Sequence, residues 1–409
     1  MERPIEFYTL PNGIRVLHIY DDSPVAYCGI GIHAGTRDEV DDSQSGMAHF
    51  IEHCVFKGTQ RRKSWNILNR LEDVGGDTNA YTEKEETFVY ATVLDEFYER
   101  AMDLCTDIVL HPTFPQKELD HEKEVIIDEI NSYNDSPSEL IYDDFESLVF
   151  NNVGLGRNIL GKEEVLSHYT TDDALRYYTA RYGTNQMIFF SMGRMTQKML
   201  HRLDDKYLRC EPARICEWAK ADSGIYHPQH LTLQKELHQV NYLAGNRAYN
   251  MFDAKRYPFF LLNNILGGPG MNSRLNLAIR EKNGMSYSVE SSFTPYSDSG
   301  IVFLYFSADI DNKERCISLL KRELKRLREE PLTATQLLKA KRQLLGQLAI
   351  ADEGKENLAL NIAKTFLYFG RYNTLEQRAA LITPITSSQL MEVANEVLIE
   401  DSLSEIIYE

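Results

Sequence analysis

Two histidines and a glutamate occur within five residues of the stretch GMAHFIEHCVFKGT, residues 46–59. His49 and His53 are four positions apart, so in a helix both imidazoles lie on one face and can reach a single metal ion. Glu52 projects toward the same side but has a shorter reach, which suits contact with a metal-bound water. This H-x-x-E-H pattern predicts a hydrolytic zinc site. The alternative interpretation is that both histidines are ordinary residues of a buried helix.

A catalytic zinc site normally has three protein ligands and leaves one position for water. The stretch HEKEVIIDEI places Glu122 and Glu129 seven residues apart, which is two turns along one face of a predicted helix. On spacing alone, either glutamate is a candidate for the third ligand. An exposed acidic helix face is the alternative interpretation of this stretch.

Strands and helices are expected to alternate around these residues. Apolar residues recur at helical spacing from about Gln44 through the histidine motif, and again over 64–76, 96–111 and 117–133. Strand-like runs rich in β-branched and aromatic residues occupy 15–20, 25–35, 77–83, 87–94 and 187–193. The metal-ligand candidates therefore fall on two predicted helices, with strands between them in the sequence.

The second half of the chain repeats this order of elements. Strands are expected within 230–248, 285–295 and 300–309, and helices over 256–268, 273–282 and 313–330. The strands at 87–94 and 300–309 occupy matching places, each followed by a long helix. Such a long repeat indicates a duplicated domain rather than a solenoid. We therefore predict a catalytic zinc-binding domain over 1–207, a linker over 208–229 and a second homologous domain over 230–409.

The composition is that of a globular protein with an acidic surface. The chain has 409 residues, with 44 Lys and Arg against 61 Asp and Glu, and a net charge of −17. That balance disfavours nucleic acid or an anionic membrane as a partner, because both require a basic surface. No apolar run approaches the ~18 residues of a membrane span.

Two further features favour a cytoplasmic protein. The N-terminal residues lack the basic start and apolar run of a signal peptide. The six cysteines are scattered along the chain and are not spaced as in a disulfide framework. We therefore expect a reduced, cytoplasmic setting.

Three stretches in succession resemble the signatures of the M16 zinc metallopeptidases, which include pitrilysin, insulin-degrading enzyme and the mitochondrial processing peptidase. These are GMAHFIEHCVFKGT, then NAYTEKEETFVY, then HEKEVIIDEI. The 76 positions from His53 to Glu129 are also similar to the family's spacing. The resemblance implies one Zn²⁺ per chain, with Glu129 as the third ligand beside His49 and His53, and Glu122 in a supporting role.

The resemblance extends into the second half of the chain. GGPGMNSRLNLAIREKNGMSYSV is similar to a family segment in which an arginine and a tyrosine hold the substrate, and those residues here are Arg280 and Tyr287. DTNAYTEK is similar to the family's edge strand, which pairs with an extended substrate. Asn79 and Ala80 are the expected contacts there. The alternative for Asn79 is a strand-end residue that satisfies its own backbone.

The implied fold class is α+β, with two similar domains from an internal duplication. Each domain would be a mixed, mostly antiparallel sheet with helices packed on it, and the chain would form one clamshell half of the short, bacterial-type branch. The implied assembly is a homodimer in which the partner subunit's Arg280 and Tyr287 complete each zinc site.

The implied function is a zinc endopeptidase acting on peptides or unfolded polypeptides, with Glu52 as the general base. Two alternatives remain. One is a non-catalytic scaffold subunit of the same fold, which the presence of every motif residue disfavours. The other is a dedicated processing peptidase with a single protein client.

Overall fold

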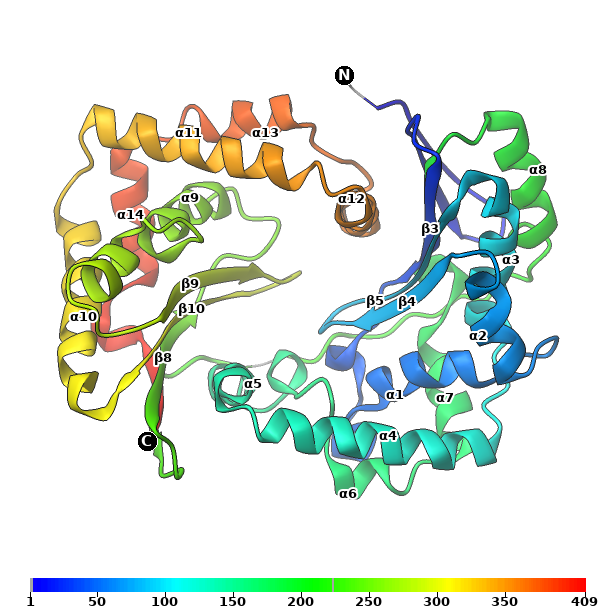
Figure 1. Ribbon diagram of the computed structural model, residues 1–409, viewed down its shortest axis with the longest axis horizontal. Helices are drawn as coiled ribbons and strands as arrows, with labels where there is room; N and C mark the ends of the chain where they lie inside the picture. The colour runs from blue at the N-terminus through cyan, green and yellow to red at the C-terminus, as the bar shows by residue number, and fades with distance from the viewer. Residues whose placement is uncertain (1–2, 223) are drawn as a thin grey trace. The chain divides into compact units, whose positions relative to one another are not determined.

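The computed structural model describes residues 3–222 and 224–409. They form two compact units (Figure 1). Unit 1 consists of Met1–Ser132, Arg157–Asp222 and Asp352–Tyr372, and unit 2 consists of Tyr133–Gly156, Ser223–Ala351 and Asn373–Glu409. These units differ from the predicted contiguous domains, 1–207 and 230–409, because each includes a segment from the other half of the chain.

Unit 1 is built on a six-stranded sheet with the strand order β1-β2-β6-β3-β5-β4. Neighbouring strands are antiparallel, except that β2 and β6 are parallel. β4 therefore forms one edge of the sheet and pairs with β5. The strands are β1 (Ile5–Thr9), β2 (Arg15–Tyr20), β3 (Val25–Ile32), β4 (Asp77–Thr82), β5 (Thr87–Leu94) and β6 (Met187–Gly193).

Helices cover both faces of this sheet. One face, which includes Ile30 and Val89, packs against apolar residues of α1, α3, α4 and α7. The opposite face, which includes Phe88 and Phe190, packs against α12, seen end-on beside the sheet in Figure 1. Burial on both faces explains why β3, β5 and β6 are almost continuously apolar. The helices of unit 1 are α1 (Met47–Cys54), α2 (Ser64–Glu72), α3 (Tyr98–Leu110), α4 (Gln116–Asn134, ending in unit 2), α6 (Glu163–Leu166), α7 (Thr171–Arg181), α8 (Gln197–Tyr207) and α12 (Lys355–Phe369).

Unit 2 repeats this plan with a five-stranded sheet in the order β7-β11-β8-β10-β9. Its strands are antiparallel, except that β7 and β11 are parallel. The strands are β7 (His230–Leu233), β8 (Gln239–Arg247), β9 (Ser288–Pro295), β10 (Gly300–Asp309) and β11 (Ser404–Tyr408). The helices are α5 (Pro137–Val149), α9 (Arg256–Gly267), α10 (Lys313–Glu329), α11 (Ala334–Ala351), α13 (Leu375–Ile382) and α14 (Ser387–Val397), with the π-helix η7 (Asn276–Glu281).

One helix from each half of the sequence belongs to the unit built mainly from the other half. α5 packs Ile141 and Phe145 against the sheet of unit 2, beside Phe303 of β10. α12 packs Ile362 and Phe366 against the sheet of unit 1. α5 follows α3 and α4 in the first half, and α12 follows α10 and α11 in the second, so the two helices occupy matching places in the duplication.

The predicted fold class, α+β with two similar and mostly antiparallel sheets, is confirmed. The helix expected over 273–282 is π-helical at Asn276–Glu281. Within the described residues, no helix is long and apolar enough to cross a membrane. All six cysteines are free.

Candidate metal centre

The helix that carries the histidines begins at a glycine with a specific structural role. Gly46 is the N-cap residue of α1 and has a φ of +83°, in the left-handed region. A Cβ atom at this position would lie 2.5 Å from the carbonyl oxygen of Leu160. Both features require glycine. The chain therefore enters α1 in one fixed conformation, with Phe50 and Ile51 buried in the core of unit 1.

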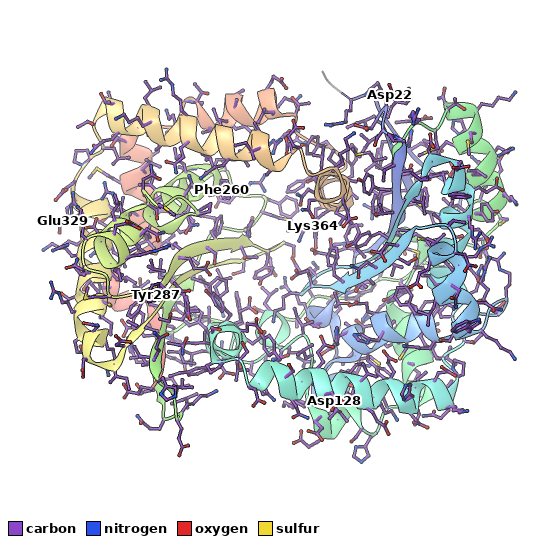
Figure 2. The ribbon with its side chains drawn as sticks, viewed as in Figure 1. Asp22, Asp128, Phe260, Tyr287, Glu329 and Lys364 are labelled. Atoms are coloured by element: carbon purple, nitrogen blue, oxygen red, sulfur yellow. The ribbon has the colours of Figure 1, made fainter. Side chains whose placement is uncertain are left out.

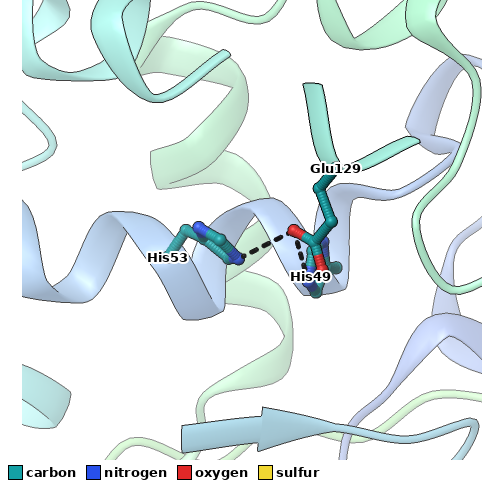
Figure 3. A group of neighbouring side chains, drawn as sticks. All are labelled: His49, His53 and Glu129. Atoms are coloured by element: carbon teal, nitrogen blue, oxygen red, sulfur yellow. Dashed lines mark ion pairs between the residues drawn. The ribbon is translucent and has the colours of Figure 1, made fainter. Parts of the chain in front are cut away.

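Side chains of α1 and α4 converge on one point (Figure 3). Nε2 of His53 lies 3.6 Å from Oε2 of Glu129, and Nε2 of His49 lies 3.9 Å from a carboxylate oxygen of the same residue. One ligand atom from each residue can be chosen so that all three lie within 4.8 Å of one another. Tetrahedral zinc ligands about 2.1 Å from the ion lie roughly 3.4 Å apart. Small side-chain movements therefore bring the three atoms to zinc-binding distances.

The chemistry of these donors suits zinc. Burial, together with the neighbouring His53, lowers the pKa of His49 to about 3, so the His49 imidazole is neutral and offers a lone pair. Nδ1 of His49 is buried and has no hydrogen-bond partner among the described residues. The Glu129 side chain is 45% exposed, which leaves one side of the site open. Two imidazoles and a carboxylate form a known donor set of catalytic zinc.

Glu122 contacts His53 from the side away from the three ligand atoms. Its Oε1 accepts a hydrogen bond from Nδ1 of His53 at 2.8 Å, and Nζ of Lys57 lies 2.5 Å from its Oε2. Burial opposes ionisation of Glu122, but the bonds from His53 and Lys57 outweigh it and lower the carboxyl pKa. A carboxylate on Nδ1 fixes the ring orientation and leaves Nε2 for a metal.

Lys57 was not singled out from the sequence. It lies in η3 (Val55–Lys57), one turn beyond His53, and pairs with the supporting Glu122 rather than with a ligand atom. The available signal was its position four residues after His53, because such spacing places two helical side chains on one face.

Glu52 lies on α1 between the two histidines in sequence. Its side chain is buried, and Oε2 has no hydrogen-bond partner within the described part of the chain. Burial raises the carboxyl pKa, and the opposing effects of Thr82 and His53 do not cancel it. A raised pKa brings a carboxyl group closer to the range in which it exchanges protons near neutral pH.

Asn79 and Ala80 lie on the edge strand β4, as predicted. They pair with Tyr90 and Val89 of β5. Oδ1 of Asn79 accepts a hydrogen bond from the N–H of Ala80 at 2.8 Å. This contact is the local backbone satisfaction considered as the alternative for Asn79. The edge position leaves one side of β4 available for an added strand.

Arg280 and Tyr287 belong to unit 2. Arg280 lies in the π-helix η7, a conformation that occurs frequently at functional sites. Tyr287 follows η7 and is 87% exposed; it is labelled in Figure 2. Both residues line a cavity of about 530 Å³ together with Tyr142, Glu290 and Tyr305.

The duplicated fold and the His–His–Glu cluster define a protein of the metallopeptidase class. The chain belongs to peptidase family M16. A family model described as insulinase (peptidase family M16) matches residues 15–163, and a model described as peptidase M16 inactive domain matches residues 168–344.

Similar proteins span the full length of the chain. An uncharacterized zinc protease of Rickettsia felis is 31% identical over 415 residues, covering 100% of this chain and 98% of the relative. The uncharacterized zinc protease YmxG of Bacillus subtilis is 29% identical over 403 residues, covering 97% and 96%.

Two solved structures share the fold. A protease from Helicobacter pylori has a TM-score of 0.89 and 18% identity, with 100% of both chains covered. A peptidase M16 inactive domain from Pseudomonas fluorescens has a TM-score of 0.90 and 18% identity, covering 99% and 98%.

Proposed function

We propose that this chain is a zinc-dependent endopeptidase that hydrolyses peptides or unfolded polypeptides. The observation that carries the proposal is the convergence of His49, His53 and Glu129 within 4.8 Å, with the buried Glu52 on the same helix. Family membership and the zinc protease names of the relatives support it. Six free thiols are compatible with the cytoplasmic location expected from the sequence.

His49, His53 and Glu129 would hold one zinc ion, which when bound supplies Lewis acidity to water and to the scissile carbonyl. Glu52 acts as the general base. It accepts a proton from the attacking water and delivers it to the leaving amine nitrogen as the C–N bond breaks. Glu122 keeps the His53 ring oriented by accepting its Nδ1 proton.

The edge strand β4 supports an extended substrate. An added peptide strand would bond to the free backbone groups on the outer side of β4, near Asn79 and Ala80. Such pairing gives affinity with little demand on side-chain identity and requires an unfolded segment. Arg280 and Tyr287 are proposed to donate hydrogen bonds to substrate oxygens.

Replacing Glu52 with Gln tests the general base. The variant should bind one zinc per chain, as wild type does, because the ligand atoms are unchanged. Hydrolysis of an internally quenched peptide should fall by about 10²–10⁴-fold, because the proton acceptor is lost. Glu124→Gln, on the exposed side of α4, is a matched control that should keep full activity. Wild-type turnover in Glu52→Gln would exclude the proposed role.

We also propose that two chains associate and that each zinc site uses the partner subunit's Arg280 and Tyr287. The support is the family resemblance and the location of these residues on unit 2 while the metal ligands lie on unit 1. Subunit exchange between Glu52→Gln and Arg280→Ala, each inactive alone, should restore about a quarter of wild-type sites. No recovery after verified exchange would exclude this assembly.

A further inference from the structure

A buried segment of polar residues precedes the metal-binding helix in unit 1. Thr36, Arg37, Asp38 and Glu39 are each at most 4% exposed. Burying ionisable side chains is costly unless each has specific partners. The partners of this segment therefore indicate what it holds in place.

Glu39 contacts the start of α1. Its Oε1 accepts a hydrogen bond from the backbone N–H of Ala48 at 3.2 Å, in the first turn of the helix and next to His49. That N–H has no partner within the helix, because the first turn lacks preceding carbonyl groups. Nη1 of Arg157 donates to the backbone oxygen of Glu39 at 3.1 Å and so fixes the residue from the other side.

Arg37 contacts the turn between β4 and β5. Its Nη1 donates to Oε1 of Glu85 at 2.7 Å, and both side chains are 2% exposed. Its backbone N–H donates to the carbonyl oxygen of Lys84 at 2.8 Å. The N–H of Thr36 donates to the carbonyl oxygen of Glu83 at 3.3 Å. Backbone and side-chain bonds together attach the segment to the turn that directly follows β4.

The turn has a further anchor on α12. The Glu86 carboxylate forms an ion pair with Lys364, which Figure 2 labels, and accepts a hydrogen bond from Tyr368. Glu86 is 2% exposed. Consecutive acidic residues of one turn are thus tied to two different elements of unit 1. These bonds, together with the pairing of β4 to β5, hold the end of β4 in place.

We propose that Arg37 and Glu39 are positioning residues that fix the metal-binding helix α1 relative to the substrate strand β4. The inference rests on the proposed peptidase function and adds two residues to it. Glu39 sets the start of α1, and with it the place of His49. Arg37 sets the turn after β4, and with it the strand that would pair with substrate.

The Glu39 contact is tested by zinc release. Glu39→Leu removes the acceptor for the Ala48 N–H, whereas Glu39→Gln keeps a carbonyl oxygen there. Asp41→Leu is the matched control, because the Asp41 carboxylate also accepts a backbone N–H, that of Ser43, but outside α1. Transfer of zinc to a chromophoric chelator should be about 10–100-fold faster in Glu39→Leu. It should stay within about threefold of wild type in the two other variants.

The Arg37 contact is tested by peptide hydrolysis. In Arg37→Met, Lys220 still lies 2.7 Å from Glu85, so that carboxylate keeps a cationic partner. kcat/KM should fall about 10–100-fold through misplacement of β4, while zinc release stays within about threefold of wild type. Arg62→Met is the control, because Arg62 forms ion pairs with Asp103 and Asp107 of α3 and does not contact the turn.

The outcomes separate this inference from the proposed function. A wild-type protein that binds zinc without cleaving any peptide would contradict the peptidase, and zinc release from the Glu39 variants would still test the inference. Wild-type zinc release in folded Glu39→Leu would overturn the role of Glu39. Wild-type kcat/KM in folded Arg37→Met would overturn that of Arg37. If Glu39→Leu does not fold, slow zinc release in Glu39→Gln combined with fast release in Glu39→Ala supports the role, and equal rates refute it.

Discussion

Units 1 and 2 repeat one architecture, but among the described residues the candidate metal ligands all belong to unit 1. The first α-helix between β3 and β4 is α1, and the first α-helix between the matching strands β8 and β9 is α9. α1 carries His49 and His53, whereas α9 has the sequence RYPFFLLNNILG, without a histidine or carboxylate. Among residues 3–222 and 224–409, the cluster His49–His53–Glu129 is the one group suited to a metal ion. The sheet-and-helix frame is therefore not sufficient for the site.

The residues near α1 and the residues that follow α9 also differ between the two units. In unit 1, Glu122 contacts Nδ1 of His53, and Lys57 forms an ion pair with Glu122. In unit 2, the segment after α9 is the π-helix with Arg280, which lines a cavity. The duplication thus provides two similar frames, one carrying the candidate metal ligands and one carrying the candidate substrate-binding residues Arg280 and Tyr287.

The largest effect is expected from removing one of the candidate metal ligands that distinguish unit 1 from unit 2. His53→Ala should lose zinc and reduce peptide hydrolysis to background, because the site is left with two ligands. His238→Ala, at an exposed position of unit 2, is the matched control and should retain both properties. Metal analysis and an internally quenched peptide assay measure the outcome. Full zinc occupancy in His53→Ala would move the metal site elsewhere.

The next prediction compares the two exchanged helices. Phe366 of α12 and Phe145 of α5 are both buried against the sheet of their unit. Each Phe→Ala change should lower the free energy of unfolding by about 3–5 kcal/mol through lost burial and a cavity. Urea denaturation followed by far-UV circular dichroism, to which the helices and strands of both units contribute, measures it. A loss below about 1 kcal/mol for Phe366→Ala would mean that α12 contributes little to unit 1.

Much of the fold could be predicted from local pattern. β5 and β10 are long apolar strands followed by amphipathic helices, and this periodicity is independent of distant contacts. The exchange of α5 and α12 could not be predicted this way. An amphipathic helix shows that it has an apolar face, but which sheet that face covers depends on the path of the whole chain.

At the candidate site, too, the sequence pattern predicted the local structure but not the contacts made in three dimensions. The spacing of His49 and His53 indicated a common helix face, and the structure places both on α1. Spacing left Glu122 and Glu129 equivalent, because both lie on one face of α4. The difference arises in three dimensions, where Glu129 meets the Nε2 atoms and Glu122 meets Nδ1 of His53.

A smaller effect is expected from changing Glu122, which contacts the candidate metal ligand His53. Glu122→Gln should weaken zinc binding about 10–100-fold, because a neutral amide holds the His53 ring less firmly than a carboxylate does. Glu124→Gln, at an exposed position on the same helix, should leave zinc affinity unchanged. Competition with a chelator of known affinity measures both. Equal affinities in the two variants would show that Glu122 does not support the ligand.

The smallest effect compares a histidine–carboxylate group in each unit. In unit 1, Nδ1 of His111 lies 3.4 Å from Oδ1 of Asp107 and Nε2 lies 3.1 Å from Oε2 of Glu211, and these two carboxylates raise the pKa of His111 to about 9. In unit 2, His230 lies 3.4 Å from Glu405, but its side chain is 63% exposed. An exposed pair of this kind contributes at most about 1 kcal/mol.

The sign of the pH dependence follows from the raised pKa of His111. The folded protein holds this proton more tightly than the unfolded chain, whose histidine has a pKa near ~6.5. The stabilisation is therefore complete below pH ~6.5 and is lost as the pH rises through about 9.

With partial solvent screening, His111→Gln should lower the free energy of unfolding by on the order of 2 kcal/mol at pH ~6 and by much less at pH ~10. His230→Gln should change it by less than about 1 kcal/mol at either pH. Urea denaturation of both variants against wild type measures these differences, and a pH-independent loss in His111→Gln would show that packing of the ring, rather than its charge, stabilises this part of unit 1.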